Sequence, residues 1–425
     1  MNVSALHALS AFVRIRRLAR RLRTPADVAR WRAARLDRFL RRTVPRAPYY
    51  ADLSPRLLGD LPVMDKATLL ANFEQLNQRG VTLAEARAAL DAGRQRVRGL
   101  IVGQSTGTSG NRGVFVISEA ERFTWLGVIL AKTLPDVLWA RHRVALALPG
   151  YSKLYASAAE SGRVALRFFD LAEGVDAWRD QLRAFTPDVL VAPPKVLRSL
   201  AEGGGLRPRH VFSGAEVLDA VDRRIIEAGM GAKVREIYMA TEGLLGVGCP
   251  HGVLHLAEDA VAFEWEPVGD TGLVTPLITD FTREVQVMAR YRMNDLLRLS
   301  PTPCPCGSPL QAVEGVEGRQ DDVFQLPAAS GSGFRMVTPD VVRNAVIDAD
   351  RRILDFRVVQ TGPDVVVLHL ARDLPTAAAQ AARVALAAAL ARAGAAVETI
   401  ELSAGLDAPT DRKLRRVRRD WTPPA

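Results

Sequence analysis

The sequence predicts an α/β protein with a large layered first domain and a small α+β domain at its C-terminus. Between residues 98 and 260, short apolar segments typical of buried strands alternate with segments of helical periodicity. From about 260 to 300 the pattern changes to short strands and turns, which predicts a small β subdomain. After GRQDDVF (318–324) a second alternation of helices and strands begins. We therefore expect a first domain over 1–317 and an independent lid domain over 318–425.

The predicted N-terminal part, residues 1–60, is a basic helical leader. Its first helix, over 5–24, carries six arginines and no acidic residue. These arginines form the solvated flank of a packed helix, or they contact an anionic membrane surface or an acidic partner. A second helix over 26–45 ends at PRAPYY because proline cannot continue a helix. A further helix is expected near 65–78.

The rest of the chain supplies the elements of the two domains. The buried-strand candidates are RVALALP (143–149), DVLVAPP (188–194) and RHVFSG (209–214). The helices between or after them are expected at 119–134, 175–185, 194–203 and 218–229. This alternation predicts a largely parallel sheet, in which ligands bind at the carboxyl ends of the strands. In the second domain we expect, in order, a helix over 338–348, strands over 353–360 and 364–371, a helix over 375–394 and a strand over 397–403.

Composition narrows the classes of function. With 425 residues, 48% of them hydrophobic and 24% charged, the chain resembles an ordinary globular protein. The net charge is +10, but the basic residues do not alternate with aromatic residues, which make up only 6% of the chain. We therefore expect no nucleic-acid partner. We expect no integral membrane segment, because no apolar run has the required length, and no secretory signal is visible. Three cysteines fit a protein of the reducing cytoplasm.

The segment GQSTGTSGNRG (103–113) is the most informative stretch of the sequence. Apolar β-like segments flank it on both sides, which predicts a hairpin loop. Its glycines allow backbone N–H groups to turn inward and its hydroxyl groups add donors, as in a nest that wraps polyphosphate. The spacing differs from the Walker loop. A flexible polar surface loop is the alternative. The residues of this candidate phosphate loop are Ser105, Thr106, Gly107, Thr108, Ser109 and Gly110.

Three further motifs supply groups that a nucleotide would need. In YMATEG (238–243), Tyr238 can stack on a base, Thr241 can contact a phosphate and Glu242 can hold Mg²⁺. SGAE (213–216) offers a glycine turn for adenine. Asp295, in YRMND, can accept hydrogen bonds from both ribose hydroxyls. Arg319, Asp321 and Asp322 follow at the domain junction.

All three cysteines fall in one candidate metal cluster. Cys304 and Cys306 form a Cys-x-Cys turn with a proline and a glycine, and Cys249 lies near His251 and His255. Three thiols and one imidazole can supply four tetrahedral ligands to a structural Zn²⁺. The alternative is three reduced thiols that pack as small hydrophobic groups.

Together these motifs resemble the adenylate-forming superfamily of acyl-CoA synthetases, and within it the phenylacetate–CoA ligase-like branch. STGTSG is similar to the family's phosphate loop, and GAE to its adenine segment. YMATEG, YRMND and GRQDD resemble three later motifs of the family, in the same order. The segments 36–53 and 61–73 are similar to N-terminal helices of the branch, so the resemblance covers nearly the whole chain.

The resemblance implies an enzyme that uses ATP and Mg²⁺ in two steps, first to form acyl-AMP and then to transfer the acyl group to a thiol. It assigns catalysis to Lys413, Glu242 and Thr241, with Glu242 as the Mg²⁺ ligand, and a hinge to Asp321. Arg412 replaces the family's glycine beside that lysine. The implied ATP and AMP contacts are Ser105, Thr106, Gly107, Thr108, Ser109, Gly110, Gly214, Ala215, Glu216, Tyr238, Met239, Asp295 and Arg319. His255 matches the histidine of metal-bearing relatives.

The resemblance also sets expectations for substrate and partners. The substrate pocket is expected to be bounded by Tyr151, Tyr155, Ser213, Met239 and Ala240, and to take an aromatic or a small unsaturated carboxylic acid. CoA, the phosphopantetheine arm of an acyl carrier protein or an amine would accept the acyl group, and relatives often form homodimers. The alternative is a nucleotide-binding homologue without turnover that docks on a carrier protein, suggested by Arg412 and by a loop after the hinge that departs from the family pattern.

Overall fold

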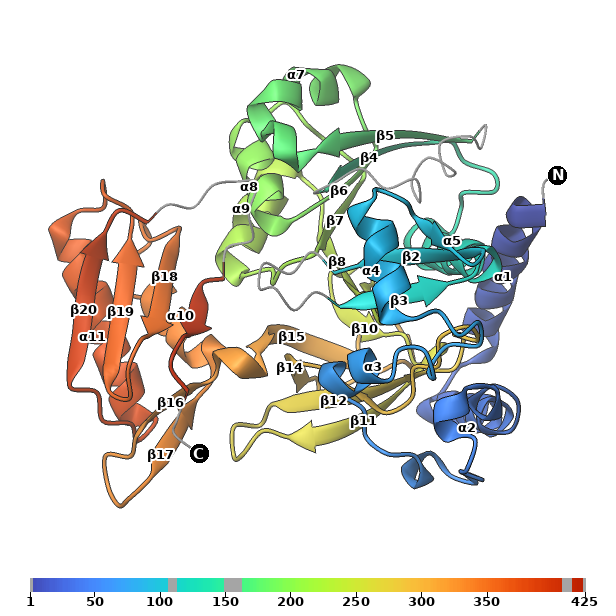
Figure 1. Ribbon diagram of the computed structural model, residues 1–425. Helices are drawn as coiled ribbons and strands as arrows, with labels where there is room; N and C mark the ends of the chain where they lie inside the picture. The colour runs from blue at the N-terminus through green and yellow to red at the C-terminus, as the bar shows by residue number, and fades with distance from the viewer. Residues whose placement is uncertain (1–2, 106–112, 149–162, 407–414, 423–425) are drawn as a thin grey trace.

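The computed structural model describes residues 3–105, 113–148, 163–406 and 415–422. Its largest element is one twelve-stranded sheet (Figure 1). The strands are β4 (His142–Leu148), β5 (Val164–Asp170), β6 (Val189–Ala192), β7 (His210–Gly214), β8 (Val234–Ala240), β9 (Gly243–Gly248), β10 (Leu254–Leu256), β11 (Val261–Pro267), β12 (Val274–Asp280), β13 (Tyr291–Arg292), β14 (Asp295–Leu299) and β15 (Ala312–Arg319). Their order is β11-β12-β14-β15-β10-β9-β8-β7-β6-β4-β5, with β13 paired to β12.

The predicted parallel sheet and the predicted small β subdomain are parts of this same sheet. The strands from β5 to β8 are parallel, whereas β8 pairs antiparallel with β9 and the strands beyond β9 continue antiparallel. Helices cover both faces of the parallel half, as a parallel sheet requires. α7 (Val175–Phe185), α8 (Pro194–Glu202) and α9 (Ala220–Met230) pack on Ala145 and Ala147. α1 (Val3–Arg21) and α5 (Glu119–Thr133) cover Val144 and Leu146 on the other face.

The basic leader packs on this sheet as a pair of helices. Ala11, Phe12 and Ile15 of α1 are buried in the core that includes α5, and the exposed positions of α1 include arginines. α2 (Pro25–Arg42) begins with a capping box, in which Thr24 accepts from the Asp27 N–H and Asp27 accepts from the Thr24 N–H. The packing of α1 matches the solvated-flank interpretation. No helix among the described residues has both the length and the apolar character needed to cross a bilayer.

The helix predicted near 65–78 is shorter than expected. α3 (Lys66–Ala71) stops at Asn72, whose side-chain amide donates to the Thr68 carbonyl. Buried Asn77 then holds the following turn, because its amide donates to the Phe73 carbonyl and to a second carbonyl at residue 81. Asparagine side chains thus compete with the helical hydrogen bonds over this segment. α4 (Leu83–Asp91), which the sequence analysis did not predict, follows.

The candidate phosphate loop connects two strands of a separate three-stranded sheet. β1 (Arg96–Val97), β2 (Leu100–Gln104) and β3 (Val114–Ile117) pair antiparallel in that order. Gln104 lies opposite Val114, so β2 and β3 form the predicted hairpin. Residues 106–112 lie outside the described part of the chain.

The C-terminal part has its own core, which includes Phe324, Phe356, Leu386 and Val417. A hairpin of β16 (Phe324–Pro327) and β17 (Phe334–Val337) leads into a four-stranded sheet. That sheet has the order β20-β19-β18-β21, built from β18 (Phe356–Gln360), β19 (Val365–Leu370), β20 (Thr399–Ala404) and β21 (Val417–Arg419). α10 (Pro339–Ile347) and α11 (Thr376–Arg392) pack on it, as predicted. In Figure 1 this unit stands beside the main sheet, next to α8, α9 and β15.

Candidate active site

A large cleft lies between the carboxyl ends of the parallel strands and the C-terminal unit. Its volume is about 1530 Å³, and both parts of the chain line it. The described site residues predicted from the sequence that line it are Ser105, Ser213, Ala215, Glu216, Tyr238, Met239, Ala240, Thr241, Glu242, Asp295, Arg319 and Asp321. Gly214 lies between two of these but does not line the cleft itself. Thr106, Gly107, Thr108, Ser109, Gly110, Tyr151, Tyr155 and Lys413 lie outside the described residues.

The two ends of the candidate phosphate loop lie near Thr241, in the turn between β8 and β9. Ser105 and Gly113 close the hairpin, because the Gly113 N–H donates to Ser105 Oγ at 2.9 Å and the Ser105 N–H donates to the Gly113 carbonyl at 2.8 Å. A Cβ at Gly113 would lie 3.6 Å from Thr241 Oγ1 and 3.9 Å from Lys66 Cε. Two hydroxyls and a lysine therefore gather at the base of the loop, where they suit a phosphate.

Thr241 and Glu242 lie between this group and a buried tyrosine. Thr241 Oγ1 donates to Glu242 Oε2 at 2.8 Å. Burial, followed by the neighbouring Glu242 carboxylate, raises the pKa of Tyr291 above its ordinary value. Tyr291 therefore stays protonated near Glu242. A carboxylate oxygen at this point is a suitable ligand for Mg²⁺ between phosphates.

Tyr238 and Asp295 meet although they come from distant parts of the chain. Tyr238 lies on β8 and Asp295 at the start of β14, and the tyrosine hydroxyl donates to Asp295 Oδ2 at 2.8 Å. Burial and the carboxylate of Asp295 raise the pKa of Tyr238 well above its ordinary value, so its hydroxyl remains a donor. Asp295 also pairs in register with Arg319 on β15. This arrangement presents a carboxylate and a guanidinium on adjacent strands.

The SGAE segment leaves β7 through a strained backbone. Ala215 has a φ of +70°, which costs a residue with a Cβ about 1–3 kcal/mol and is frequent at ligand sites. The Ser213 hydroxyl before it is buried and without a hydrogen-bond partner among the described residues. Glu216 after it lines the cleft. The segment thus turns backbone and side chains of 213–216 along the cleft wall.

The hinge candidate is tied to the YRMND motif. Asn294 Nδ2 donates to Asp321 Oδ2 at 2.6 Å, and the Asp321 N–H donates to Asn294 Oδ1 at 3.2 Å. The next residue, Asp322, forms an ion pair with Arg415, which lies just before β21. The two aspartates therefore hold opposite sides of the junction, one toward the main sheet and one toward the C-terminal unit.

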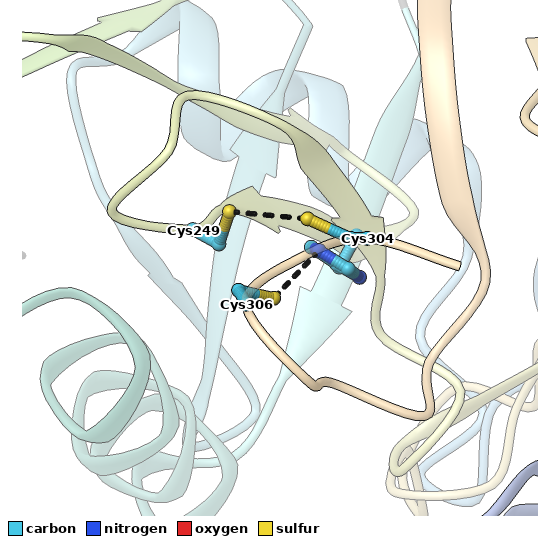
Figure 2. Close-up of side chains that lie close together, drawn as sticks. Cys249, Cys304 and Cys306 are labelled. Carbon is cyan, nitrogen blue, oxygen red and sulfur yellow. Dashed lines mark hydrogen bonds between the residues drawn. The ribbon is translucent and has the colours of Figure 1, made fainter. Parts of the chain in front are cut away.

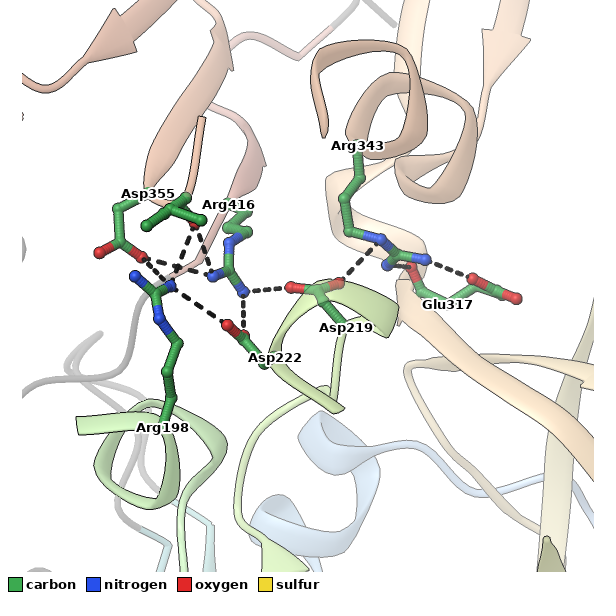
Figure 3. Close-up of polar contacts among 8 residues, drawn as sticks. Arg198, Asp219, Asp222, Glu317, Arg343, Asp355 and Arg416 are labelled. Carbon is green, nitrogen blue, oxygen red and sulfur yellow. Dashed lines mark hydrogen bonds and ion pairs between the residues drawn. The ribbon is translucent and has the colours of Figure 1, made fainter. Parts of the chain in front are cut away.

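A buried network of charges fastens the C-terminal unit over the cleft (Figure 3). Arg416 pairs with Asp219 and with Asp222 at 3.1 Å, both near the start of α9. Arg343 on α10 pairs with the same Asp219 at 2.9 Å and with Glu317 on β15 at 2.6 Å. Burial disfavours the charge of Arg416, but Asp219, Asp222 and the nearby Asp355 outweigh it and raise its pKa. These ion pairs thus connect the C-terminal unit to α9 and β15 of the main sheet.

The predicted metal ligands form a compact cluster away from the cleft (Figure 2). One ligand atom from each of Cys249, His255, Cys304 and Cys306 lies within 4.8 Å of the others. The sulfurs of Cys249 and Cys304 are 3.8 Å apart, too far for a disulfide, and Cys306 Sγ is 3.4 Å from His255 Nε2. His251 is exposed and does not belong to the cluster.

These distances fit a tetrahedral ion. With Zn–S bonds of about 2.3 Å, two sulfur ligands lie about 3.8 Å apart, and a sulfur and a nitrogen ligand slightly closer. His255 Nδ1 is 3.0 Å from the Leu310 carbonyl, which fixes Nε2 as the nitrogen that faces the sulfurs. None of the four residues lines the cleft. The donor set therefore suits a structural metal.

Sequence reasoning missed several residues of the cleft. Lys66 was part of a segment noted only for its resemblance to the family, and it lies at the base of the phosphate loop. Lys195 lines the cleft at the start of α8, where burial lowers its pKa against the opposing charges of Asp355 and Glu216. Arg343 carries no local signal, because the sequence holds 57 lysines and arginines and no motif marks this one. Arg416 lies in TDRKLRRVRRD (410–420), the segment that the resemblance uses for Lys413, but no role was assigned to it.

Comparisons with known proteins agree with the motifs. No family model matches the chain. The phenylacetate-coenzyme A ligase of Pseudomonas putida is 28% identical over 165 residues, 34% of this chain and 36% of that protein, so the match spans about a third of the relative. A 2-hydroxyisobutyryl-CoA ligase in its postadenylation state with 2-HIB-AMP has a TM-score of 0.63 at 20% identity, covering 96% of this chain and 89% of that one.

A second solved structure supports the same fold. The anthranilate CoA ligase AuaEII, in complex with anthranoyl-AMP, has a TM-score of 0.52 at 15% identity, covering 75% of this chain and 65% of that one. At these identities the structures establish the fold, and the curated relative and the ordered motifs add the sequence link. The chain therefore has the fold of the acyl-CoA ligases in these structures, and about a third of it is similar in sequence to a phenylacetate-coenzyme A ligase.

Proposed function

We propose that the protein uses ATP and Mg²⁺ to convert an aromatic carboxylic acid into its acyl-AMP, and then transfers the acyl group to a thiol. The observation that carries this proposal is the meeting of Ser105, Gly113 and Thr241 at one end of the cleft. Phosphate-binding hydroxyls, the candidate metal ligand Glu242 and the Tyr238–Asp295 pair then follow one another along a single wall.

In the first step, a carboxylate oxygen of the acid attacks the α-phosphorus of ATP and pyrophosphate leaves. Negative charge builds on the phosphate oxygens, so fixed donors and a metal stabilise the transition state. We assign Thr241 and the loop N–H groups to these oxygens, Glu242 to Mg²⁺, and Asp295 to the ribose. The resemblance assigns the lysine of this step to Lys413, and the residues that follow it, Arg415 and Arg416, line the cleft.

In the second step, the sulfur of CoA or of a phosphopantetheine arm attacks the acyl carbonyl, the thiol proton is released and AMP leaves. We propose that residues 318–425 act as a lid that turns about Asp321 between the two steps. The contacts of Asp321 and Asp322 with Asn294 and Arg415 support a hinge here, because they would have to change when the lid turns.

Acid-dependent exchange of pyrophosphate into ATP tests the first step. The panel consists of aromatic and short aliphatic acids, with Glu242→Gln as the test variant and Glu173→Gln, at an exposed position, as its matched control. We expect exchange with one class of acid, a loss of at least about 100-fold in Glu242→Gln, and no change in the control. Exchange by Glu242→Gln at the wild-type rate would contradict the assigned role of Glu242. The same acids with CoA or with pantetheine then identify the acceptor.

We also propose that the Cys249–His255–Cys304–Cys306 cluster binds a structural Zn²⁺. The ligand geometry and the distance of the cluster from the cleft support a structural role. Elemental analysis of the purified protein should find about one zinc per chain, and protein without zinc would contradict the proposal.

A further inference from the structure

A second, smaller cavity adjoins the cleft beside the start of β9, just after the turn that carries Thr241. Its volume is about 40 Å³, which is room for a few non-hydrogen atoms but not for a ring. Phe115, Ile117 and Trp125 line both this cavity and the cleft, so the two spaces meet at these side chains. Gly243, which directly follows Thr241 and Glu242, forms part of its wall. The cavity therefore begins beside the predicted reaction centre.

One wall of this apolar cavity carries a buried carboxyl group. Asp280 is 3% exposed and lines the cavity. Its Oδ1 accepts the Thr282 N–H at 2.8 Å and the Thr282 hydroxyl at 2.6 Å. Oδ2 has no donor among the described residues, and a Cβ at Gly243 would lie 3.0 Å from it. Oδ2 is not among the completely covered polar atoms that lack a partner, so it keeps accessible surface that a donor could reach, and Asp280 lines the cavity.

The other polar groups of the cavity do not supply that partner. Glu121 accepts the N–H groups of Glu284 and Val285, so it is engaged with the backbone. Arg283 lies over the Phe115 ring at 5.7 Å, and its Nη1 is completely covered and has no hydrogen-bond partner among the described residues. Burial raises the pKa of Asp280, and the contacts with Thr282 and the charge of Arg283 oppose that shift. A donor brought in by a ligand would stabilise the ionised carboxylate.

We place one aromatic ring between the predicted reaction centre and Asp280, where the cleft and the cavity meet. Thr241 and Glu242 form the turn between β8 and β9, and Gly243 directly after them borders the cavity, so the predicted reaction centre and the cavity are neighbours. The ring would rest on Phe115, Ile117 and Trp125, and only its substituent would enter the 40 Å³ cavity.

Building on the proposed function, we propose that Asp280 makes the enzyme select aromatic acids that carry a hydrogen-bond donor, a hydroxyl or amino group, at the end of the ring opposite the carboxylate. An acid without this group would leave Asp280 Oδ2 desolvated and unpaired. Sites built to bond a substrate hydroxyl reject the analogue that lacks it much more strongly than an apolar pocket rejects an extra methylene.

Pyrophosphate exchange with paired acids tests the selection: 4-hydroxybenzoate and 4-aminobenzoate against benzoate, and 4-hydroxyphenylacetate against phenylacetate. We expect kcat/KM to favour the donor-bearing member of the pair at least 10-fold. Asp280→Asn keeps a carbonyl for Thr282 but replaces Oδ2 by a donor. This variant should lose the preference and gain activity on 4-methoxybenzoate, whose ether oxygen is an acceptor.

Thr282→Val is the matched control, because it weakens the same turn and leaves Asp280 Oδ2 in place. It should lower the melting temperature and retain the wild-type preference. Equal kcat/KM values for hydroxylated and unsubstituted acids in the wild type, or an unchanged ratio in Asp280→Asn, would overturn the inference and leave the proposed function standing. Folded protein that binds ATP but shows no exchange with any acid would overturn both.

Discussion

The charge network across the domain junction allows a quantitative test of how the lid is seated. Asp219 is buried, the side chain of Arg416 is only 12% exposed, and the two residues belong to opposite sides of the junction. Arg416→Met removes the guanidinium and keeps most of the apolar stem, and Asp219→Asn removes one charge at nearly constant volume. Because the two positions are in direct contact, their effects on the free energy of unfolding should not be additive.

The magnitude follows from the partners that remain. Removing one member of a buried ion pair costs about 3–5 kcal/mol when its partner is left alone. Here Asp219 would keep Arg343 at 2.9 Å, Asp222 would keep Arg198 at 3.2 Å, and Arg416 would keep Asp222. Each single substitution should therefore cost less, about 2 kcal/mol, with a coupling energy of about 1–2 kcal/mol between the two positions.

Urea unfolding of the wild type, both single variants and the double variant measures this coupling. The matched control is the cycle for Arg352 and Asp350, an exposed pair within the C-terminal unit, for which we expect no measurable coupling. A coupling below about 0.5 kcal/mol between Arg416 and Asp219 would refute the reasoning, because it would mean that the two groups do not interact in solution.

Three further predictions concern single features. Cys304→Ser should lose the bound metal and lower the melting temperature, while the KM for ATP changes little; an unchanged melting temperature would contradict a structural metal. Ala215→Gly should stabilise the fold by about 1 kcal/mol, since glycine tolerates the positive φ, and denaturant unfolding measures it. Burial, together with Arg235 and other nearby positive charges, lowers the pKa of His210, so the folded state binds fewer protons than the unfolded state. Stability should therefore fall as the pH drops below about 6.5, and His210→Gln should flatten that slope; equal slopes would dismiss the effect.

Elements whose own residues form a regular pattern were predicted from the sequence to within a residue or two. The helix expected at 175–185 is α7 (Val175–Phe185), because Trp178 and Leu182 lie one turn apart and both face the core. Both C-terminal helices were also predicted to within two residues, whereas the strand expected at 353–360 begins at Phe356, and β16, β17 and β21 were not predicted. The phosphate hairpin was predicted because glycine and hydroxyl residues interrupt two apolar segments.

Strands rich in glycine escaped prediction. β9 (Gly243–Gly248) contains three glycines, which normally argue against a strand. Here they are required, because a Cβ at Gly246 would lie 2.8 Å from the His255 carbonyl oxygen, and one at Gly248 would lie 2.7 Å from the Glu236 nitrogen. Only the pairing of distant strands reveals that close approach, and a local pattern contains no trace of it.

In the candidate site, too, some residues could be predicted from the sequence and others could not. Cys249, Cys304 and Cys306 were assigned to one cluster because cysteine is so rare in the chain that a shared purpose was the simplest hypothesis. Asp280 had no such signal, since one carboxylate in a turn resembles any other. Its importance comes from burial and from an oxygen without a donor, which depend on the folded chain.

Two ligands of the proposed metal cluster and two of the predicted nucleotide contacts occupy opposite ends of one hairpin. Cys304 and Cys306 lie in the connection between β14 and β15, and Asp295 faces Arg319 at the open end. Two register shifts interrupt the pairing between those ends, so the strands alone do not determine the alignment strongly. A slip by one residue would turn Asp295 to the other face of the sheet. An ion bound at the connection would favour the correct strand register during folding, because only that register brings all the metal ligands together. The same register also places Asp295 opposite Arg319.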